Sequence, residues 1–301
     1  MTSFTRIWWG LAPAILLVAG CGPFKLSNRF SAVETVLQSY KVDGKQQIVA
    51  DTFNGAVDVL TGANDKVEIK VTKRTGGPSQ EEADDDLENI DVRFEQTGNK
   101  ILIRVKSLNP KPFVNRGAAI EIQVPDGSSL DLHTTNGKVS AVGMMGDIVA
   151  RTSNGRIQTQ SSRGNLDLET SNGPISVEGG AGKVSAHSTN GAIDIASDKA
   201  LVDAHTSNGH IAFRGTLVAG DHMLKTSNGS ISLKLPDNTA FKLEARTSNG
   251  RITTDFAGES ESPGKKKKTS KSQMSGTFGN GPAGVSLNLS TSNGHIDIKH
   301  Q

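Results

Sequence analysis

Three histidines have the spacing to bind a metal ion together. His187 and His205 lie 18 residues apart, and His210 follows five positions after His205. Neutral imidazoles are common ligands of zinc and other transition metals. No carboxylate stands at a matching position to orient the rings, as metal-bound histidines usually require. These residues form the candidate metal site, and the sequence favours surface histidines without a metal.

Carboxylates that could cleave a polysaccharide are scattered through the chain. Glycoside hydrolysis needs paired carboxylates at a defined separation. The candidate acids share no single spacing: they are Asp147, Asp167, Glu169, Asp194 and Asp203. The sequence contains no nucleotide loop, thiol nucleophile or catalytic triad spacing, and aromatic residues make up only 4% of it. We therefore expect no enzyme and no cofactor, with a glycan-processing β-helix enzyme as the alternative.

A basic segment interrupts the chain between residues 257 and 284. Glycine, serine and proline dominate it, and its cations are Lys265, Lys266, Lys267, Lys268 and Lys271. This composition is typical of a flexible surface loop that protects a sheet edge. The charge also fits a contact with anionic glycans or lipids of a cell envelope. The near-neutral net charge of +2 argues against nucleic acid as a partner.

The tetrapeptide Thr-Ser-Asn-Gly recurs along the chain and sets its period. From Asn136 to Asn208 its copies fall every 18 residues. Within each period, residues two and four positions after a glycine are mostly aliphatic, and polar residues lie between them. This alternation indicates half-buried strands, two per period, joined by tight turns. Stacked two-strand coils bury the apolar side that a single coil cannot, so the sequence predicts an all-β solenoid, or β-helix.

The recurring turn predicts a ladder of amides along one edge of this solenoid. We expect glycine to supply positive φ at the corner, and the threonine and asparagine side chains to point inward. Stacked identical amides can hydrogen-bond to one another. The expected ladder residues are Asn136, Asn154, Asn172, Asn190, Asn208, Asn228, Asn249 and Asn293. We interpret this motif as structural rather than ligand-binding.

The first 20 residues have the composition of a targeting segment. A positive residue, Arg6, precedes a short apolar core that runs into Val18-Ala19-Gly20-Cys21. This resembles a bacterial lipoprotein signal, which is cleaved before the cysteine. The resemblance implies a diacylglycerol on Cys21 and a fatty acyl chain, such as palmitate, on its new amino group. Gly22 after the cysteine resembles the sorting pattern for the outer membrane.

The chain divides into four parts. Residues 1–20 are the expected signal peptide and residues 21–40 a tether. Residues 41–127 are an irregular β region that caps the first coil, with a short helix after the capping box at Ser79. Residues 128–301 form the regular solenoid, with residues 257–284 inserted.

Together, the signal, the irregular β region and the Asn-Gly repeats resemble the bacterial putative-adhesin domain family of β-strand repeats. The resemblance covers roughly residues 45–301 and implies an envelope protein with no catalytic residue to carry over. We therefore expect an exported, lipid-anchored protein on the outer membrane, its periplasmic face or the cell surface. The expected role is adhesion, scaffolding or stress sensing with an unidentified protein partner, and an end-to-end stacking subunit is a further alternative.

Overall fold

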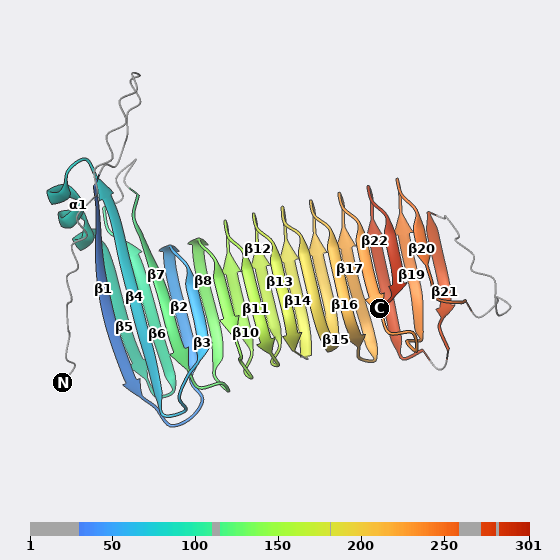
Figure 1. The fold of residues 1–301 in the computed structure, drawn as a ribbon, viewed down its shortest axis with the longest axis horizontal. Helices are drawn as coiled ribbons and strands as arrows, with labels where there is room; N and C mark the ends of the chain where they lie inside the picture. Colours follow the sequence, from blue (N-terminus) through green and yellow to red (C-terminus); the bar gives the residue numbers. More distant parts are fainter. Residues whose placement is uncertain (1–29, 110–114, 181, 259–271, 281–282) are drawn as a thin grey trace, which may run out of the picture.

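The chain forms an elongated β-solenoid in the computed structural model (Figure 1). The structure describes residues 30–109, 115–180, 182–258, 272–280 and 283–301. Its helical segments within these ranges are α1 (Gln80–Asp86) and the short 3-10 helix η1 (Leu87–Asn89). Within the same ranges, no helix has the length and apolar character needed to cross a membrane. The all-β solenoid predicted from the 18-residue period is confirmed.

Each regular coil contributes one strand to each of two rows of parallel strands. Strands two apart in the chain pair in exact 18-residue register, as Ile148 with Leu166 and Ile157 with Ile175. The long strand β15 serves both rows. The strands of the regular part are β8 (Ser129–Asn136), β9 (Val139–Val142), β10 (Ile148–Thr152), β11 (Ile157–Ser162), β12 (Leu166–Thr170), β13 (Ile175–Gly180), β14 (Gly182–Ser188), β15 (Ile193–Thr206), β16 (Ile211–Leu217), β17 (Gly220–Thr226) and β18 (Ile231–Leu235).

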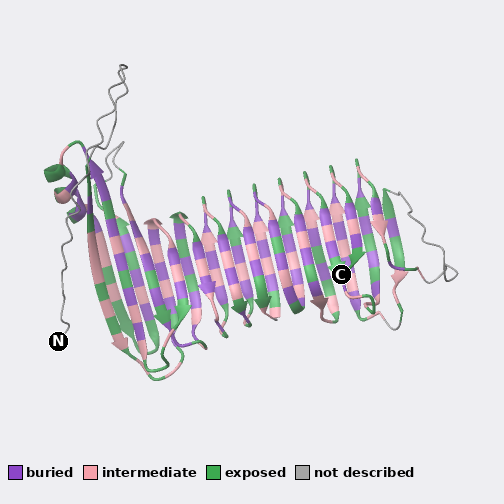
Figure 2. Cartoon of the chain, in the orientation of Figure 1, coloured by how far each residue is buried: buried purple, intermediate pink, exposed green. Residues whose placement is uncertain are grey.

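The two rows enclose a continuous apolar core. Alternate residues of each strand are buried, and this alternation repeats along the whole rod (Figure 2). Equivalent residues of successive coils stack in columns, for example Ile157, Ile175 and Ile193, each with no exposed surface. Burial of these columns supplies the main stabilising free energy, because each coil alone would leave its apolar side in water.

One core column contains a buried hydroxyl. Thr159 of β11 lies between Ala141 and Val177, is 1% exposed, and its Oγ1 has no hydrogen-bond partner among the described residues. An unpaired buried hydroxyl carries an uncompensated desolvation cost. We expect Thr159→Val, which keeps the shape of the side chain, to raise the free energy of unfolding by about 1 kcal/mol. Thermal denaturation measures this, with Thr253→Val at a half-buried, hydrogen-bonded site as the control; an unchanged or lower stability of Thr159→Val would contradict the assignment.

His222 of β17 lies in another core column, next to Leu287, where the repeat elsewhere has an aliphatic residue. The ring is fully buried. Its Nδ1 accepts a hydrogen bond from the Val202 N–H at 3.1 Å, so Nε2 is the protonated nitrogen that donates to the Val218 carbonyl at 2.9 Å. Burial lowers the pKa of His222 below its ordinary value of 6.5 and outweighs the opposing effects of the Val218 carbonyl and Asp221.

This histidine makes stability depend on pH. Because the pKa is lower in the folded state, its contribution is complete above pH 6.5 and is lost as the pH falls below 6.5 toward the folded-state pKa. We expect the free energy of unfolding to fall more steeply between pH 6.5 and 5 in the native chain than in His222→Leu, as measured by chemical denaturation. Parallel pH profiles for the two proteins would show that His222 does not contribute.

The C-terminal coils are stacked in a different order from their order in the sequence. The remaining strands are β19 (Phe241–Thr247), β20 (Ile252–Thr254), β21 (Gln273–Phe278), β22 (Val285–Thr291) and β23 (Ile296–His300). Strand β22 pairs with both β17 and β19, and β23 pairs with both β18 and β20. The last coil of the sequence is therefore inserted between two earlier ones. Antiparallel β21 then covers the outer edge of β19.

At the N-terminal end, too, the coils are stacked in a different order from their order in the sequence. Its strands are β1 (Phe30–Lys41), β2 (Gln47–Asn54), β3 (Val57–Thr61), β4 (Lys66–Gly77), β5 (Ile90–Thr97), β6 (Lys100–Ser107) and β7 (Gly117–Val124). The coil β2–β3 lies between β6–β7 and β8–β9 and pairs in parallel with both. Antiparallel β5 covers β6, and antiparallel β4 and β1 extend from β7.

Two expectations for this region need correction. The expected tether of residues 21–40 ends earlier, because residues 30–41 form β1 and pair along their full length with β4. The expected irregular region of residues 41–127 contains a regular coil, since Thr52 of β2 lies in register with Thr134 of β8. The remaining strands of this region do cover the end of the stack. The expected signal peptide lies outside the described residues.

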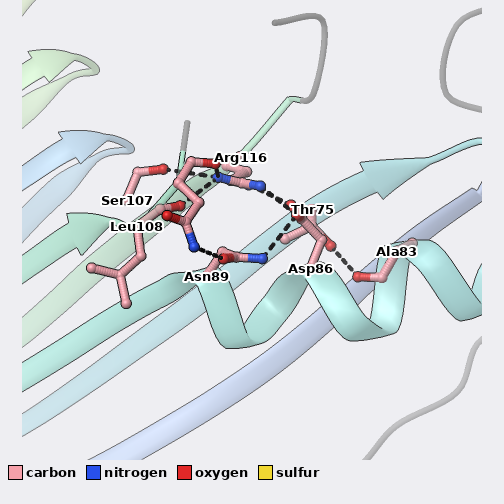
Figure 3. A network of polar contacts seen from close by, with 8 residues as sticks. Thr75, Ala83, Asp86, Asn89, Ser107, Leu108 and Arg116 are labelled. Atoms are coloured by element: carbon pink, nitrogen blue, oxygen red, sulfur yellow. Dashed lines mark hydrogen bonds and ion pairs between the residues drawn. The ribbon is translucent and has the colours of Figure 1, made fainter. Parts of the chain in front are cut away.

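A buried ion pair fixes α1 to the end of the solenoid (Figure 3). Ser79 caps this helix by accepting a hydrogen bond from the Glu82 N–H. Arg116 forms two hydrogen bonds to the Asp86 carboxylate and donates two more to the carbonyls of Leu108 and Asn109, at 2.8 and 2.9 Å. Both charged side chains are almost fully buried. Their mutual pairing offsets the cost of desolvation and fixes the helix against the loop before β7.

Candidate functional site

The Thr-Ser-Asn-Gly turns stack along one edge of the rod, the upper edge in Figure 1. Each turn joins a strand of one row to a strand of the other. The first residue points inward: Thr170 is 2% exposed, and its hydroxyl donates to the Gly155 carbonyl of the preceding turn at 3.0 Å. The same contact recurs from Thr152 to Gly137 and from Thr206 to Gly191. Each turn is thereby bonded to its neighbour.

The turn glycines are required by close packing of the backbone. From Gly137 to Gly294 none of them has a positive φ, so the expectation that glycine supplies a left-handed corner is wrong for these turns; Gly55 of the first turn is the exception. A Cβ on Gly173 would lie 1.9 Å from the Gly155 carbonyl oxygen, and one on Gly155 would lie 1.8 Å from that of Gly137. No side chain fits at this distance. The turns can stack at the strand spacing only with glycine here.

The asparagines of the turns form an unbroken ladder of side-chain amides. Asn154 donates to Asn136, Asn172 to Asn154 and Asn190 to Asn172, each at 2.8 Å. Bonds of the same length continue through Asn208, Asn228, Asn293 and Asn249, in that order. Two details differ from the sequence-based expectation. The asparagines are exposed rather than inward-pointing, and Asn293 precedes Asn249 because the last coil is inserted.

The three candidate histidines do not come together as a metal site. The rings of His187 and His205 meet edge to face with their centroids 6.2 Å apart. His210 lies across the turn and pairs with Asp194, its Nε2 being 3.1 Å from the carboxylate oxygen. Among the described residues, no three histidine, cysteine, aspartate or glutamate side chains converge on one point. His187 and His205 alone supply two of the four ligands that a structural zinc site uses.

Two other predicted sites fall on residues that the structure does not describe. The expected lipid attachment residue Cys21 lies within residues 1–29, and Lys265, Lys266, Lys267, Lys268 and Lys271 lie within residues 259–271.

A shallow depression on one face brings acidic and basic side chains near each other. It has a volume of about 620 Å³, and the residues that line it include Ala196, Ala212, Glu178, Asp194 and Arg214. Two of the carboxylates already have partners: Glu178 accepts from Gln160 at 3.0 Å, and Asp194 pairs with His210. Of the acids considered from the sequence, Asp167 pairs with Arg151 at 2.9 Å. Each of these three carboxylates therefore contacts a neighbouring side chain at the surface.

Sequence reasoning missed part of the stacked edge. The second residue of the turn motif and the residue after its glycine also form columns, partly or fully exposed, since Ser153 stacks near Ser171 and Arg156 follows Gly155. The same 18-residue register would have located both columns. The Arg116–Asp86 pair was also missed, and no spacing in the sequence connects those two residues.

Comparison with known proteins identifies the family. The Toastrack DUF4097 family matches residues 47–299. The comparison with curated proteins found no match. Three solved structures match most of this chain. A "putative cell adhesion protein" from Clostridium sporogenes is 14% identical, with 88% of this chain and 99% of that chain covered and a TM-score of 0.25.

The second is a "putative adhesin" from Bacteroides fragilis, also 14% identical, with 89% and 97% covered and a TM-score of 0.32. The third is a "putative adhesin" from Parabacteroides distasonis, 7% identical, with 87% and 96% covered and a TM-score of 0.31. The match over residues 47–299 spans most of the sequence and confirms the resemblance noted from the repeats. The chain belongs to the Toastrack DUF4097 family.

Proposed function

We propose that this protein is a non-enzymatic, adhesin-like rod that is anchored to the bacterial envelope by lipid on Cys21. The observation that carries the proposal is the stacked edge, where eight exposed asparagines repeat in one straight ladder. A rigid rod with a repeated surface presents the same contact many times, which suits binding to an extended partner.

The lipid anchor is tested by metabolic labelling in the producing bacterium. Cells grown with an alkyne fatty acid are expected to label the native protein and to retain it in the membrane fraction. Cys21→Ala removes the only cysteine of the chain and is expected to abolish both the label and the retention. Ser27→Ala, which leaves the cysteine in place, is the matched control. A Cys21→Ala protein that stays membrane-bound would overturn the anchor.

Adhesion is tested separately from anchoring. Deleting the gene is expected to reduce attachment of the cells to a surface or to one another, and a plasmid copy of the native gene restores it. Restoration by a copy with Cys21→Ala would show that adhesion does not need the anchor. An unchanged attachment in the deletion strain would contradict an adhesive role.

End-to-end association is the second candidate function, and one feature favours it. Strand β1 is 12 residues long and pairs only with β4 among the described residues. Its outward side includes the exposed residues Val33 and Leu37. A free strand edge with apolar side chains can pair with a second copy. If two copies pair in this way, the mass of the native protein measured by sedimentation increases with concentration, and Val33→Lys with Leu37→Lys abolishes the increase. A native protein that stays monomeric at all concentrations excludes end-to-end association.

A further inference from the structure

The stacked turns carry many hydrogen-bonding groups that the fold does not use. We call the row of these groups the turn ridge. It contains the eight ladder asparagines and the hydroxyls of Thr135, Ser153, Ser171, Thr189, Ser207, Ser227, Ser248 and Ser292. In the part of the chain that the structure describes, none of these hydroxyls has a side-chain partner. An inner ladder amide such as Asn172 donates once and accepts once within the ladder. Since an amide has two N–H donors and two acceptor lone pairs, one of each remains free.

Positive side chains line both sides of this ridge. Two further columns of residues flank the ridge: one residue stands just before the first position of each turn, and another just after the last. We call these the flanking columns, and their residues point outward from the two rows of strands. Their cations are Lys138, Arg151, Arg156, Lys225, Arg246 and Arg251, and their carboxylates are Asp51 and Glu169. The two columns thus contain six cations and two carboxylates. Three of the cations are ion-paired: Lys138 with Asp58, Arg151 with Asp167 and Glu169, and Arg246 with Glu244.

Several of these cations are free to meet a ligand. Among the described residues, Arg156, Lys225 and Arg251 have no carboxylate within ion-pair distance. Five histidines of the same columns add further ring nitrogens: His133, His187, His205, His210 and His295. A single cation at an exposed site contributes little, but cations grouped beside neighbouring turns create a positive local potential, here toward the two ends of the ridge rather than at its middle turns.

The ridge has a fixed translational repeat, and this restricts what can match it. Free amide and hydroxyl groups recur once per coil, at roughly 4.8 Å, and cations stand beside the turns at residues 134–137, 152–155, 226–229 and 247–250. A globular protein surface has no such repeat. An extended 1,4-linked polysaccharide advances by one sugar over about the same distance as one coil, its hydroxyls can both donate and accept, and acidic sugars or phosphate substituents place negative charges at regular intervals.

We propose that the turn ridge and its flanking columns bind an extended, linear polysaccharide that carries carboxylate or phosphate groups. The proposal rests on the adhesin-like function above, which places the rod where such polymers occur. The ridge contains no aromatic residue, because Phe53 lies in the turn before it, so each sugar is held by polar contacts alone. Affinity then comes from many weak contacts made together, and it must rise with the length of the polymer.

The experiment uses the full chain, purified in detergent, and fluorescent polygalacturonate fragments of graded length as the probe. Fluorescence polarisation is expected to give an affinity that rises at least about tenfold from short to long fragments. In high salt the affinity for long fragments is expected to fall by about tenfold, because the flanking charges are exposed. A neutral β-glucan of equal length is expected to bind at least about tenfold more weakly. An affinity independent of length, or equal binding of the neutral glucan, would overturn the proposal.

Matched variants locate the site. Arg156→Gln, Lys225→Gln and Arg251→Gln together remove three unpaired cations from the flanking columns and are expected to weaken binding by at least about tenfold. The control, Arg163→Gln, Lys183→Gln and Lys199→Gln, removes the same charge beside the turns of the opposite edge and is expected to bind as the native protein does. Equal losses in both variants would show that net charge alone, rather than this edge, governs binding.

A third variant separates sugar recognition from charge. Ser171→Ala, Ser207→Ala and Ser227→Ala remove free hydroxyls and leave every ladder amide in place. We expect a several-fold loss for polygalacturonate and no change for inorganic polyphosphate. No loss for polygalacturonate, or single-stranded DNA of equal charge binding as tightly as polygalacturonate, would refute recognition of the sugar.

Unchanged melting temperatures confirm that the variants fold. Failure of these binding assays leaves the lipid-labelling result untouched, so the two proposals fail independently.

Discussion

Replacing Gly173 by alanine is expected to unfold the central coils of the solenoid. The new methyl group would lie 1.9 Å from the Gly155 carbonyl oxygen, which belongs to the neighbouring backbone and cannot rotate away. To make room, two coils must separate. This breaks the hydrogen bond from the Thr170 hydroxyl to the Gly155 carbonyl and the side-chain hydrogen bond between Asn172 and Asn154. We expect a loss above about 5 kcal/mol, at the extreme of single substitutions. Chemical denaturation or the loss of soluble protein measures it.

The matched control is Gly127→Ala, in the turn before β8. A Cβ there would lie 3.5 Å from its nearest neighbour, the Lys45 side chain, and Gly127 does not have a positive φ. This variant is expected to fold with a stability within about 1 kcal/mol of the native protein. If Gly173→Ala is equally stable, the turns do not approach one another as closely as the structure indicates, and the role assigned to the turn glycines is wrong.

The regular part of the fold could be predicted because every coil repeats the same local signals. Period-two burial and matching turns 18 residues apart leave few alternatives to stacked coils, and Ile157 and Ile175 lie where this register puts them. The orientation of the turn residues could not be predicted in the same way. Extending the strand alternation through the turn placed Asn172 inside, but the chain leaves the strand after Thr170, so the next two residues project outward.

The ends of the rod follow rules that the repeat does not contain. The turn motif of β22–β23 looks like any other copy, and nothing in Thr291-Ser-Asn-Gly294 indicates insertion between two earlier coils. Which coil is adjacent depends on long-range strand pairing, whereas a repeat pattern reports only that a coil can pair. The same limit applies to β1, whose residues carry no turn motif and were therefore assigned to a tether.

The insertion of the last coil predicts an unusual response to truncation. In a simple linear array, removing the last coil leaves a shorter but intact rod. A chain that ends at Gly284 instead loses the layer between β17–β18 and β19–β20, together with five buried side chains: Val285, Leu287, Leu289, Ile296 and Ile298. We expect aggregation or loss of a cooperative thermal transition, because burial of these side chains contributes roughly 10 kcal/mol.

A matched pair of substitutions in the full-length chain tests the same order of coils without truncation. Ile252 of β20 and Ile296 of β23 are both fully buried and lie in register. Strand β23, which contains Ile296, pairs with a strand on each side, whereas β20, which contains Ile252, pairs only with β23 among the described strands. Ile296→Ala is therefore expected to cost about 4 kcal/mol and Ile252→Ala about 2 kcal/mol, because the cavity at Ile296 is enclosed from both directions and can collapse less. If Ile252→Ala costs more stability than Ile296→Ala, and the truncated chain still melts cooperatively near the native temperature, then β22–β23 lies at the end of the rod. The larger effect at Ile296 would instead establish that the C-terminal coil holds the final layers together, so that folding of this end is completed only when the last residues of the chain are in place.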